Sequence, residues 1–104
     1  QETRSRVRRS IIESAQVVVA TCIGAGDPVL QGLAFGTVVV DEAAQVIEPA
    51  ALVPLSFHPR RCILIGDQNQ LPPPVASVDA TNGGLAVSLF ARLVLNGTKP
   101  RMLE

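Results

Sequence analysis

Three short runs dense in apolar and β-branched residues divide this chain, and helical or glycine-rich segments separate them. The runs are QVVVATC (16–22), TVVVDE (37–42) and RCILIGD (61–67). Each is too short for a buried helix, so we expect three strands. The second run is apolar throughout until its acidic end, which is typical of a strand covered on both faces.

Helical spacing is found before and between these runs. The segment RSRVRRSIIESA spaces apolar residues as one helix face does (Val7, Ile11, Ile12 and Ala15). A second helix is expected from about Glu48, with Pro49 at a first helical position and Pro54 ending or kinking it. A third, GGLAVSLFARLVLNG, ends at Asn96-Gly97 and carries one apolar face (Leu85, Leu89, Phe90, Leu93 and Val94). Strands alternating with helices predict an α/β fold, a parallel sheet with flanking helices.

Two segments are predicted to be loops. IGAGDPVLQGLAFG contains four glycines and one proline, and QNQLPPPV contains three consecutive prolines. Three consecutive prolines cannot occupy the interior of a helix or a sheet, so the second loop is expected to be extended.

Composition allows one small domain or part of a larger one. The chain has 104 residues, is 47% hydrophobic and has no net charge, so it can bury a core but its total charge indicates no partner. Four arginines crowd the N-terminus (Arg4, Arg6, Arg8 and Arg9). They form either a phosphate-contacting patch or the solvated face of a helix whose apolar side points inward, and the pattern favours the second.

The two cysteines, Cys22 and Cys62, lie inside apolar runs without a second Cys or a His at metal-ligand spacing. We interpret them as reduced core residues, which fits an intracellular protein of the cytoplasm or nucleus. No membrane span or signal peptide is expected. The first residue is Gln1 rather than Met, which suggests a piece of a longer chain.

Polar residues follow the predicted strands, at the edge where parallel sheets bind ligands. They are Thr21, Asp41 with Glu42, and Asp67. Mg²⁺ binds through one or two carboxylates plus substrate phosphates, so Asp41 suits the metal, and Glu42 suits proton removal from an attacking water. The same acid pair is also explained by simple capping of the next helix.

A second element follows the third strand, where ILIGDQNQLPP places Gln70 on a loop stiffened by Pro72, Pro73 and Pro74. A neutral amide there can bond a γ-phosphate and lose that bond when the phosphate leaves. An ordinary proline-rich connection has the same composition.

These segments together resemble superfamily-1 helicases. DEAAQ (41–45) and GDQNQLPP (66–73) resemble motifs II and III. ATCIGAGDPVL and SLFARLVLNG resemble the branch that contains the RNA helicase of nonsense-mediated mRNA decay and senataxin. The resemblance implies part of a RecA-like P-loop NTPase domain over residues 1–104, using ATP and Mg²⁺.

The resemblance also implies residue roles at the nucleotide. Asp41 would coordinate Mg²⁺, Glu42 would activate water and Gln70 would sense the γ-phosphate, so these three form the implied catalytic set. Gln45 would tie the magnesium motif to its neighbours, and Asp67 would link the ATP state to nucleic-acid grip.

A second set of implied roles concerns single-stranded RNA or DNA. Thr21 and the turn with Gly24 and Gly26 would contact the strand through a hydroxyl and exposed backbone N–H groups, which suit phosphate contacts that ignore base sequence. β-propensity alone explains Thr21 nearly as well.

The phosphate loop G-x-x-x-x-G-K-[ST] is absent, because the only lysine, Lys99, precedes Pro100. The remainder of a helicase chain, with an upstream phosphate loop and a downstream second RecA-like domain, is therefore an expected partner, and this chain alone is predicted not to hydrolyse ATP.

Two alternatives stay open. One is a non-catalytic module of the same fold that binds nucleic acid or a helicase. The other is a metal-dependent phosphatase built on Asp41, Glu42 and Asp67, which is disfavoured because the chain contains no D-x-D.

Overall fold

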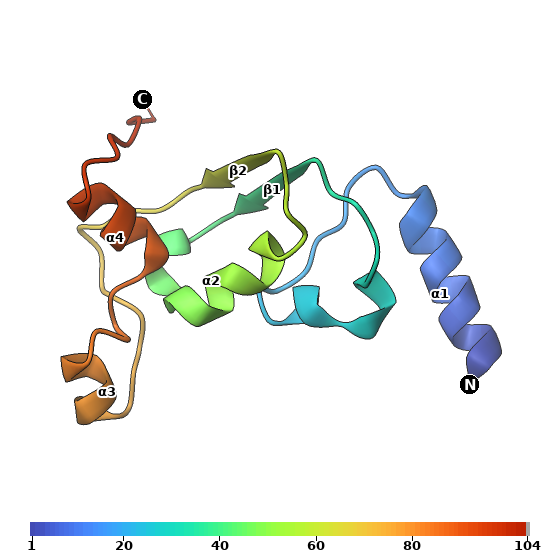
Figure 1. Ribbon diagram of the computed structural model, residues 1–104, viewed down its shortest axis with the longest axis horizontal. Coiled ribbons are helices and arrows are strands. Elements are labelled where there is room, and N and C mark those ends of the chain that lie inside the picture. Colours follow the sequence, from blue (N-terminus) through green and yellow to red (C-terminus); the bar gives the residue numbers. More distant parts are fainter. Residues whose placement is uncertain (104) are drawn as a thin grey trace.

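The computed structural model describes residues 1–103. The molecule is flat, with a two-stranded sheet at its centre (Figure 1). The α-helices and strands, in chain order, are α1 (Glu2–Ser14), β1 (Thr37–Val40), α2 (Glu48–Leu55), β2 (Arg61–Leu64), α3 (Val78–Asn82) and α4 (Leu89–Leu95). Single 3₁₀ turns are η1 (Gly24–Gly26), η2 (Pro28–Leu30) and η3 (Ala43–Gln45).

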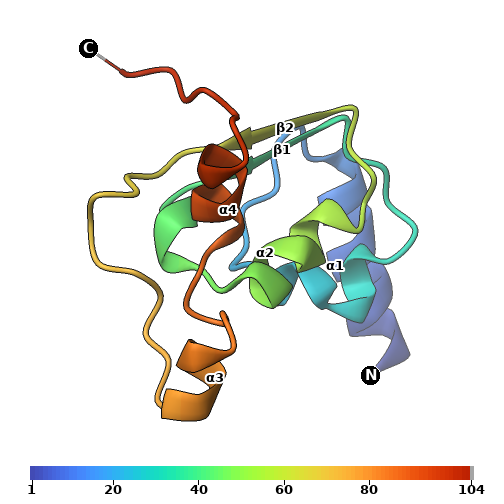
Figure 2. The same ribbon diagram turned by 60° about the vertical axis from the view of Figure 1, so that its left-hand side comes forward.

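The sheet is parallel, as predicted. β1 and β2 pair in register from Thr37 opposite Arg61 to Val40 opposite Leu64. The connection between them contains η3 and α2, and α2 lies beside the strands in both views of the ribbon (Figures 1 and 2). Parallel strands need such a crossover, so the α/β class with flanking helices is confirmed.

The predicted strand 16–22 is wrong. This segment has no regular secondary structure, and Val17 and Val19 are exposed by 78% and 90%. It lies beside β1, but a groove lined by residues of both separates them, and no backbone hydrogen bond joins the two. β-branched residues favour an extended chain, but a strand forms only where a neighbour accepts its ladder of hydrogen bonds.

The core gathers where the strands end. Val40, Ala43, Ala44 and Phe90 form the buried cluster, which brings α4 against the end of β1 and η3. Phe90 is 8% exposed, which confirms it as a core residue. The rings of Phe35 and Phe57 pack edge to face with their centroids 4.9 Å apart, so both are packing residues as expected.

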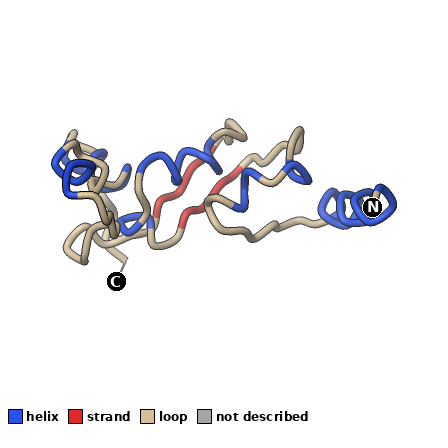
Figure 3. The backbone as a smooth tube through the Cα atoms, turned by 90° about the horizontal axis from the view of Figure 1, so that it is seen from below, coloured by secondary structure: helices blue, strands red, loops and turns tan. Residues whose placement is uncertain are grey.

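Helix α1 stands apart at one end of the molecule (Figure 3). Val7 and Ile11 are exposed by 54% and 63%, so the expectation that its apolar side faces inward is wrong. One tether is Arg9, whose guanidinium donates hydrogen bonds to the carbonyls of Val29 (3.0 Å) and Gln31 (2.6 Å). The helix is therefore anchored through backbone carbonyls near η2 rather than through a buried apolar face.

Helix α2 begins at the predicted residue, and α4 ends where the sequence indicated. Pro49 lies in the first turn of α2 and Pro54 near its end. α4 starts later than its apolar pattern, because buried Ser88 caps it by accepting from the N–H of Ala91 (3.0 Å), and it ends before Gly97 at φ +99°. The short helix α3 follows the proline-rich loop and was not expected.

The chain leaves much apolar surface uncovered. Its radius of gyration is 15.9 Å, against about 13 Å for a compact domain of this length. Cys62 on β2 is exposed, so its interpretation as a core residue is wrong, whereas Cys22 is half-buried. Both are free thiols. Among residues 1–103, none of the helices is both long and apolar enough to cross a membrane.

Candidate functional site

The chain segments that follow β1 and β2 are bonded to each other. The N–H of Ile65 donates to the carbonyl of Val40 (2.9 Å), and the N–H of Ala43 donates to the carbonyl of Ile65 (2.7 Å). These two bonds extend the parallel pairing beyond the last strand residues. They hold the acid pair Asp41–Glu42 at the same edge as the loop that begins at Gly66.

The two acids differ in backbone conformation. Asp41 is exposed, and its Oδ1 accepts a hydrogen bond from the N–H of Glu42 (2.9 Å). Glu42 is exposed and left-handed, with φ +52° and ψ +38°. Left-handed conformations are rare outside glycine and cluster at functional sites. The turn therefore exposes two adjacent acids, of which only Glu42 has a left-handed backbone.

Gln70 reaches this edge through its side chain. The Nε2 group of Gln45 donates to Oε1 of Gln70 across 3.4 Å. The loop is ordered locally, since Oδ1 of Asp67 accepts from the N–H of Asn69 (2.9 Å) and the carbonyl of Asp67 accepts from the N–H of Gln70 (3.2 Å). The structure thus places Asp41, Glu42, Gln45, Asp67 and Gln70 around one edge of the sheet.

Gly66 makes this close approach possible, and the sequence pattern alone did not single it out. A Cβ atom at this position would lie 2.9 Å from the backbone nitrogen of Ala44 and 3.3 Å from its Cβ. The loop after β2 therefore packs directly on η3, which only glycine permits. A glycine directly before Asp67 was the available signal.

The donor set at this edge fits Mg²⁺ bound partly by substrate. Within residues 1–103, no three His, Cys, Asp or Glu side chains lie together as a complete metal-binding group. Mg²⁺ keeps several waters and takes one or two carboxylates plus phosphates. Asp41 engages only its Oδ1 in a hydrogen bond within the described chain, so its other oxygen can meet such an ion.

Thr21 and Asp41 line one groove of about 470 Å³ between segment 18–22 and β1. Thr21 lies on irregular backbone rather than at the end of a strand, yet it still shares this groove with Asp41. The groove, named here the Thr21–Asp41 groove, is otherwise mainly apolar, with Val18, Leu30, Phe35 and Val40 among its lining residues.

The turn after Thr21 differs from expectation. Oγ1 of Thr21 accepts from the N–H of Gly24 (2.9 Å), and the N–H groups of Ala25 and Gly26 donate to the carbonyls of Thr21 and Ile23. The expectation that the N–H groups of Gly24 and Gly26 are free is therefore wrong, because acceptors within the same turn already bind them. Gly24 is needed, since a Cβ there would lie 2.8 Å from Thr21 Oγ1. Within the described part of the chain, the hydroxyl of Thr21 donates no hydrogen bond, so its proton can meet another acceptor.

An ion pair behind this edge joins α2 to α4. Arg92 donates from Nε and Nη2 to the two carboxylate oxygens of Glu48, at 2.8 and 2.7 Å. The hydrogen bonds from Arg92, opposed by desolvation, lower the pKa of Glu48, and the same pair raises the pKa of Arg92. The sequence marked Glu48 only as a helix start, because its partner is 44 residues away.

Most of this chain is similar in sequence to known proteins. A family model described as an AAA domain matches residues 1–78. The chain is 43% identical over 96 residues to a regulator of nonsense transcripts 1 homolog of Arabidopsis thaliana, covering 92% of this chain and 8% of the relative. It is 41% identical over 95 residues to helicase sen1 of Schizosaccharomyces pombe, covering 89% and 6%.

A third relative is the ATP-dependent helicase upf1 of Schizosaccharomyces pombe, 36% identical over 92 residues, with 88% of this chain and 10% of the relative covered. The chain therefore belongs to the AAA domain family of P-loop NTPases, in the superfamily-1 helicase branch of the regulators of nonsense transcripts and helicase sen1. It spans about a tenth or less of the length of these curated relatives.

Proposed function

We propose that this chain is the C-terminal part of a RecA-like ATPase domain, and that the helicase containing it couples ATP hydrolysis to translocation and unwinding on single-stranded RNA or DNA. The observation that carries the proposal is the hydrogen bond between Gln45 and Gln70. It joins the chain after β1, which bears the acid pair, to the loop after β2. A nucleotide bound at this edge can meet the acids and the amide at once.

Asp41 would hold Mg²⁺ on the β- and γ-phosphates, and that ion would neutralise charge developing on the transferred phosphoryl group. Glu42 would accept a proton from the attacking water. Its left-handed backbone distinguishes Glu42 from the equally exposed Asp41, which supports separate roles for the two acids.

Gln70 would sense the γ-phosphate through its amide. Its Oε1 accepts from Gln45, and its Nε2 group donates to no residue from 1 to 103, so Nε2 can donate to a phosphate oxygen. Gln45 thus acts as a positioning residue that keeps the donor end of Gln70 toward the nucleotide. Asp67, which orders the turn before Gln70, would transmit loss of that contact to the loop with the prolines.

The nucleic acid would lie on the side of Thr21. Its hydroxyl proton remains available for a phosphate oxygen, while η1 with Gly24 and Gly26 shapes the backbone beside it. The Thr21–Asp41 groove supports coupling, because one groove wall carries Thr21 and the other ends at the magnesium ligand.

The rest of the helicase would supply what these residues lack, namely a phosphate loop and the arginines of a second RecA-like domain. Exposed apolar residues on and after β2 support further packing there, since Ile63 and Ile65 are exposed by 42% and 39%. Transition-state arginines are worth about 10³ to 10⁵ in rate. We therefore expect no ATP turnover by the isolated chain.

The test is Glu42→Gln in the protein that contains this chain, with phosphate release stimulated by nucleic acid as the readout. Losing general-base catalysis should slow release by about 10²-fold or more, while nucleotide binding persists. Asp79→Asn, an acid-to-amide change on exposed α3, is the matched control and should keep full turnover. A parent protein that binds nucleic acid without any ATP turnover would instead support the non-catalytic module.

A further inference from the structure

The four arginines of α1 fall into two kinds. Arg6 pairs with Glu2 (3.1 Å), and Arg9 pairs with Glu13 (2.6 Å) while also bonding the carbonyls near η2. These pairs occupy both acids of the helix, and the positive excess that is left belongs to Arg4 and Arg8.

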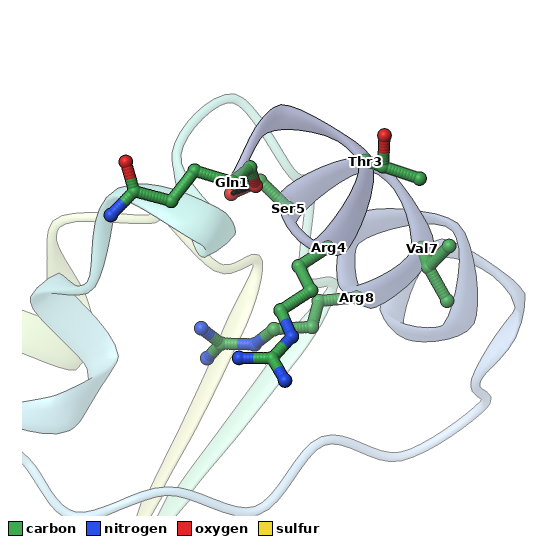
Figure 4. A pocket seen from close by; sticks show the side chains of 6 residues that line it. All are labelled: Gln1, Thr3, Arg4, Ser5, Val7 and Arg8. Carbon is green, nitrogen blue, oxygen red and sulfur yellow. Dashed lines mark hydrogen bonds between the residues drawn. The ribbon is translucent and has the colours of Figure 1, made fainter.

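Arg4 and Arg8 lie on one side of α1. Figure 4 shows their guanidinium groups next to each other, whereas Thr3 and Val7 point to the other side of the helix. Both side chains line a hollow at the start of α1. Neither forms a salt bridge or a side-chain hydrogen bond with any residue from 1 to 103. Like charges four positions apart repel on a helix, so an anion between them relieves a repulsion that the fold leaves in place.

We propose that Arg4 and Arg8 form a second contact site for the nucleic-acid strand, one that binds its phosphodiester groups. The inference rests on the proposed helicase function. Arginine matches phosphate oxygens in geometry as well as charge, and such contacts are independent of base sequence. The two arginines differ in this from Arg6 and Arg9, whose charges are already neutralised within the helix.

The position of α1 supports a strand as the occupant. Its tether, Arg9, bonds the carbonyls of Val29 and Gln31 at η2, and η2 follows η1, the turn beside Thr21. The arginine pair is thereby anchored to the same stretch of chain that carries the proposed contact at Thr21. A strand that passes Thr21 can continue onto α1.

The experiment measures binding of labelled single-stranded RNA and DNA oligonucleotides of equal length, over a series of salt concentrations, by the protein that contains this chain. Arg4→Ala and Arg8→Ala should each make the slope of log K against log salt less negative by about 0.7, the value for one single-strand phosphate contact. Arg6→Ala is the matched control, since it removes one arginine from the same exposed helix but one that is paired with Glu2. Its slope should stay as in the parent.

Each outcome decides the proposal. If the slope becomes less negative with both RNA and DNA, the result supports phosphate contacts common to the two kinds of nucleic acid. If the slope changes with only one of them, the result still supports the site but assigns it to that kind of nucleic acid. If Arg4→Ala and Arg8→Ala bind with the parent's slope, or if Arg6→Ala shifts it equally, the site is wrong while the helicase function stands. If the parent protein binds neither oligonucleotide, both proposals fall. Far-UV circular dichroism of the variants confirms that α1 remains helical, as alanine favours.

Discussion

The side-chain amide of Gln45 donates to the side-chain carbonyl of Gln70 across 3.4 Å, although 25 positions separate them in the chain. This bond crosses from η3 to the loop after β2, at the edge where both strands end. An exposed hydrogen bond between neutral groups contributes only about 1 kcal/mol. It is therefore strong enough to bias the orientation of Gln70 and weak enough to change with the nucleotide state.

The first prediction concerns this pair in the protein that contains the chain. Gln70→Ala should lower kcat/KM for ATP hydrolysis, because it removes the proposed γ-phosphate donor, and Gln45→Ala should lower it less. The double variant should be no worse than Gln70→Ala, since Gln45 acts through Gln70. Steady-state kinetics of the parent, the two single variants and the double variant checks this, with Gln68→Ala as the neighbouring amide control. Strictly additive losses would contradict a positioning role for Gln45.

The second prediction separates conformational strain from chemistry. Glu42 and His58 are the two non-glycine residues with positive φ, both at +52°, among residues 1–103. Replacing either with glycine should raise the free energy of unfolding by about 1 kcal/mol, because glycine adopts this conformation without strain. Urea unfolding measures the gain.

Only the change at position 42 should abolish ATP turnover in the protein that contains the chain, and Glu42→Gln should abolish it without the stability gain. Full turnover by Glu42→Gly would remove the general-base role. An unchanged unfolding free energy in both glycine variants would show that neither turn is strained.

The third prediction tests the close contact between Gly66 and Ala44. Gly66→Ala puts a methyl group 2.9 Å from the backbone nitrogen of Ala44, so it should destabilise the fold by about 1 to 3 kcal/mol, as overpacking does. Gly36→Ala is the control, since its Cβ would meet only the end of Arg60 at 3.6 Å, and it should change stability by less than about 0.5 kcal/mol. Equal melting temperatures for the two variants would show that the loop after β2 does not pack on η3 as described.

The fourth prediction is a pH dependence at Glu48. Arg92 lowers the pKa of Glu48 in the fold below its ordinary value of 4.5, against an opposing effect of desolvation. The pair therefore contributes stability above that pH and loses it as the pH falls through the lowered pKa of the folded state. Glu48→Gln should be less stable than the parent at neutral pH, and the difference should shrink in acid.

Denaturant unfolding at a series of pH values checks this, and Arg92→Ala should show the same convergence in acid. Glu2→Gln is the control, because its pair with Arg6 is exposed by 83% and 80% and surface pairs contribute little. If the difference in the free energy of unfolding between Glu48→Gln and the parent stayed constant from neutral pH to well below 4.5, the pair with Arg92 would not be what lowers the pKa of Glu48.

Local signals predicted much of the fold. The apolar runs before Asp41 and Asp67 became parallel neighbours, and Pro49 and Gly97 lie at helix boundaries as expected. The prediction of a strand at 16–22 was wrong because β-branched residues indicate only a preference for extended backbone, whereas a strand also needs a neighbouring strand edge to hydrogen-bond with. The prediction that the apolar side of α1 faces inward was wrong for a related reason. Helical spacing identifies an apolar side, but it does not show whether anything covers Val7 and Ile11.

By itself, the sequence determined the class of fold, the helicase resemblance and the acids that follow the two strands, because these depend on residue types at short spacing. Only the tertiary structure decided that Gln45 meets Gln70, that Thr21 shares a groove with Asp41, and that Arg92 holds Glu48. Each of these contacts joins distant parts of the chain. Such contacts form only once parallel pairing and the packing of Gly66 on η3 have set the register between the segments.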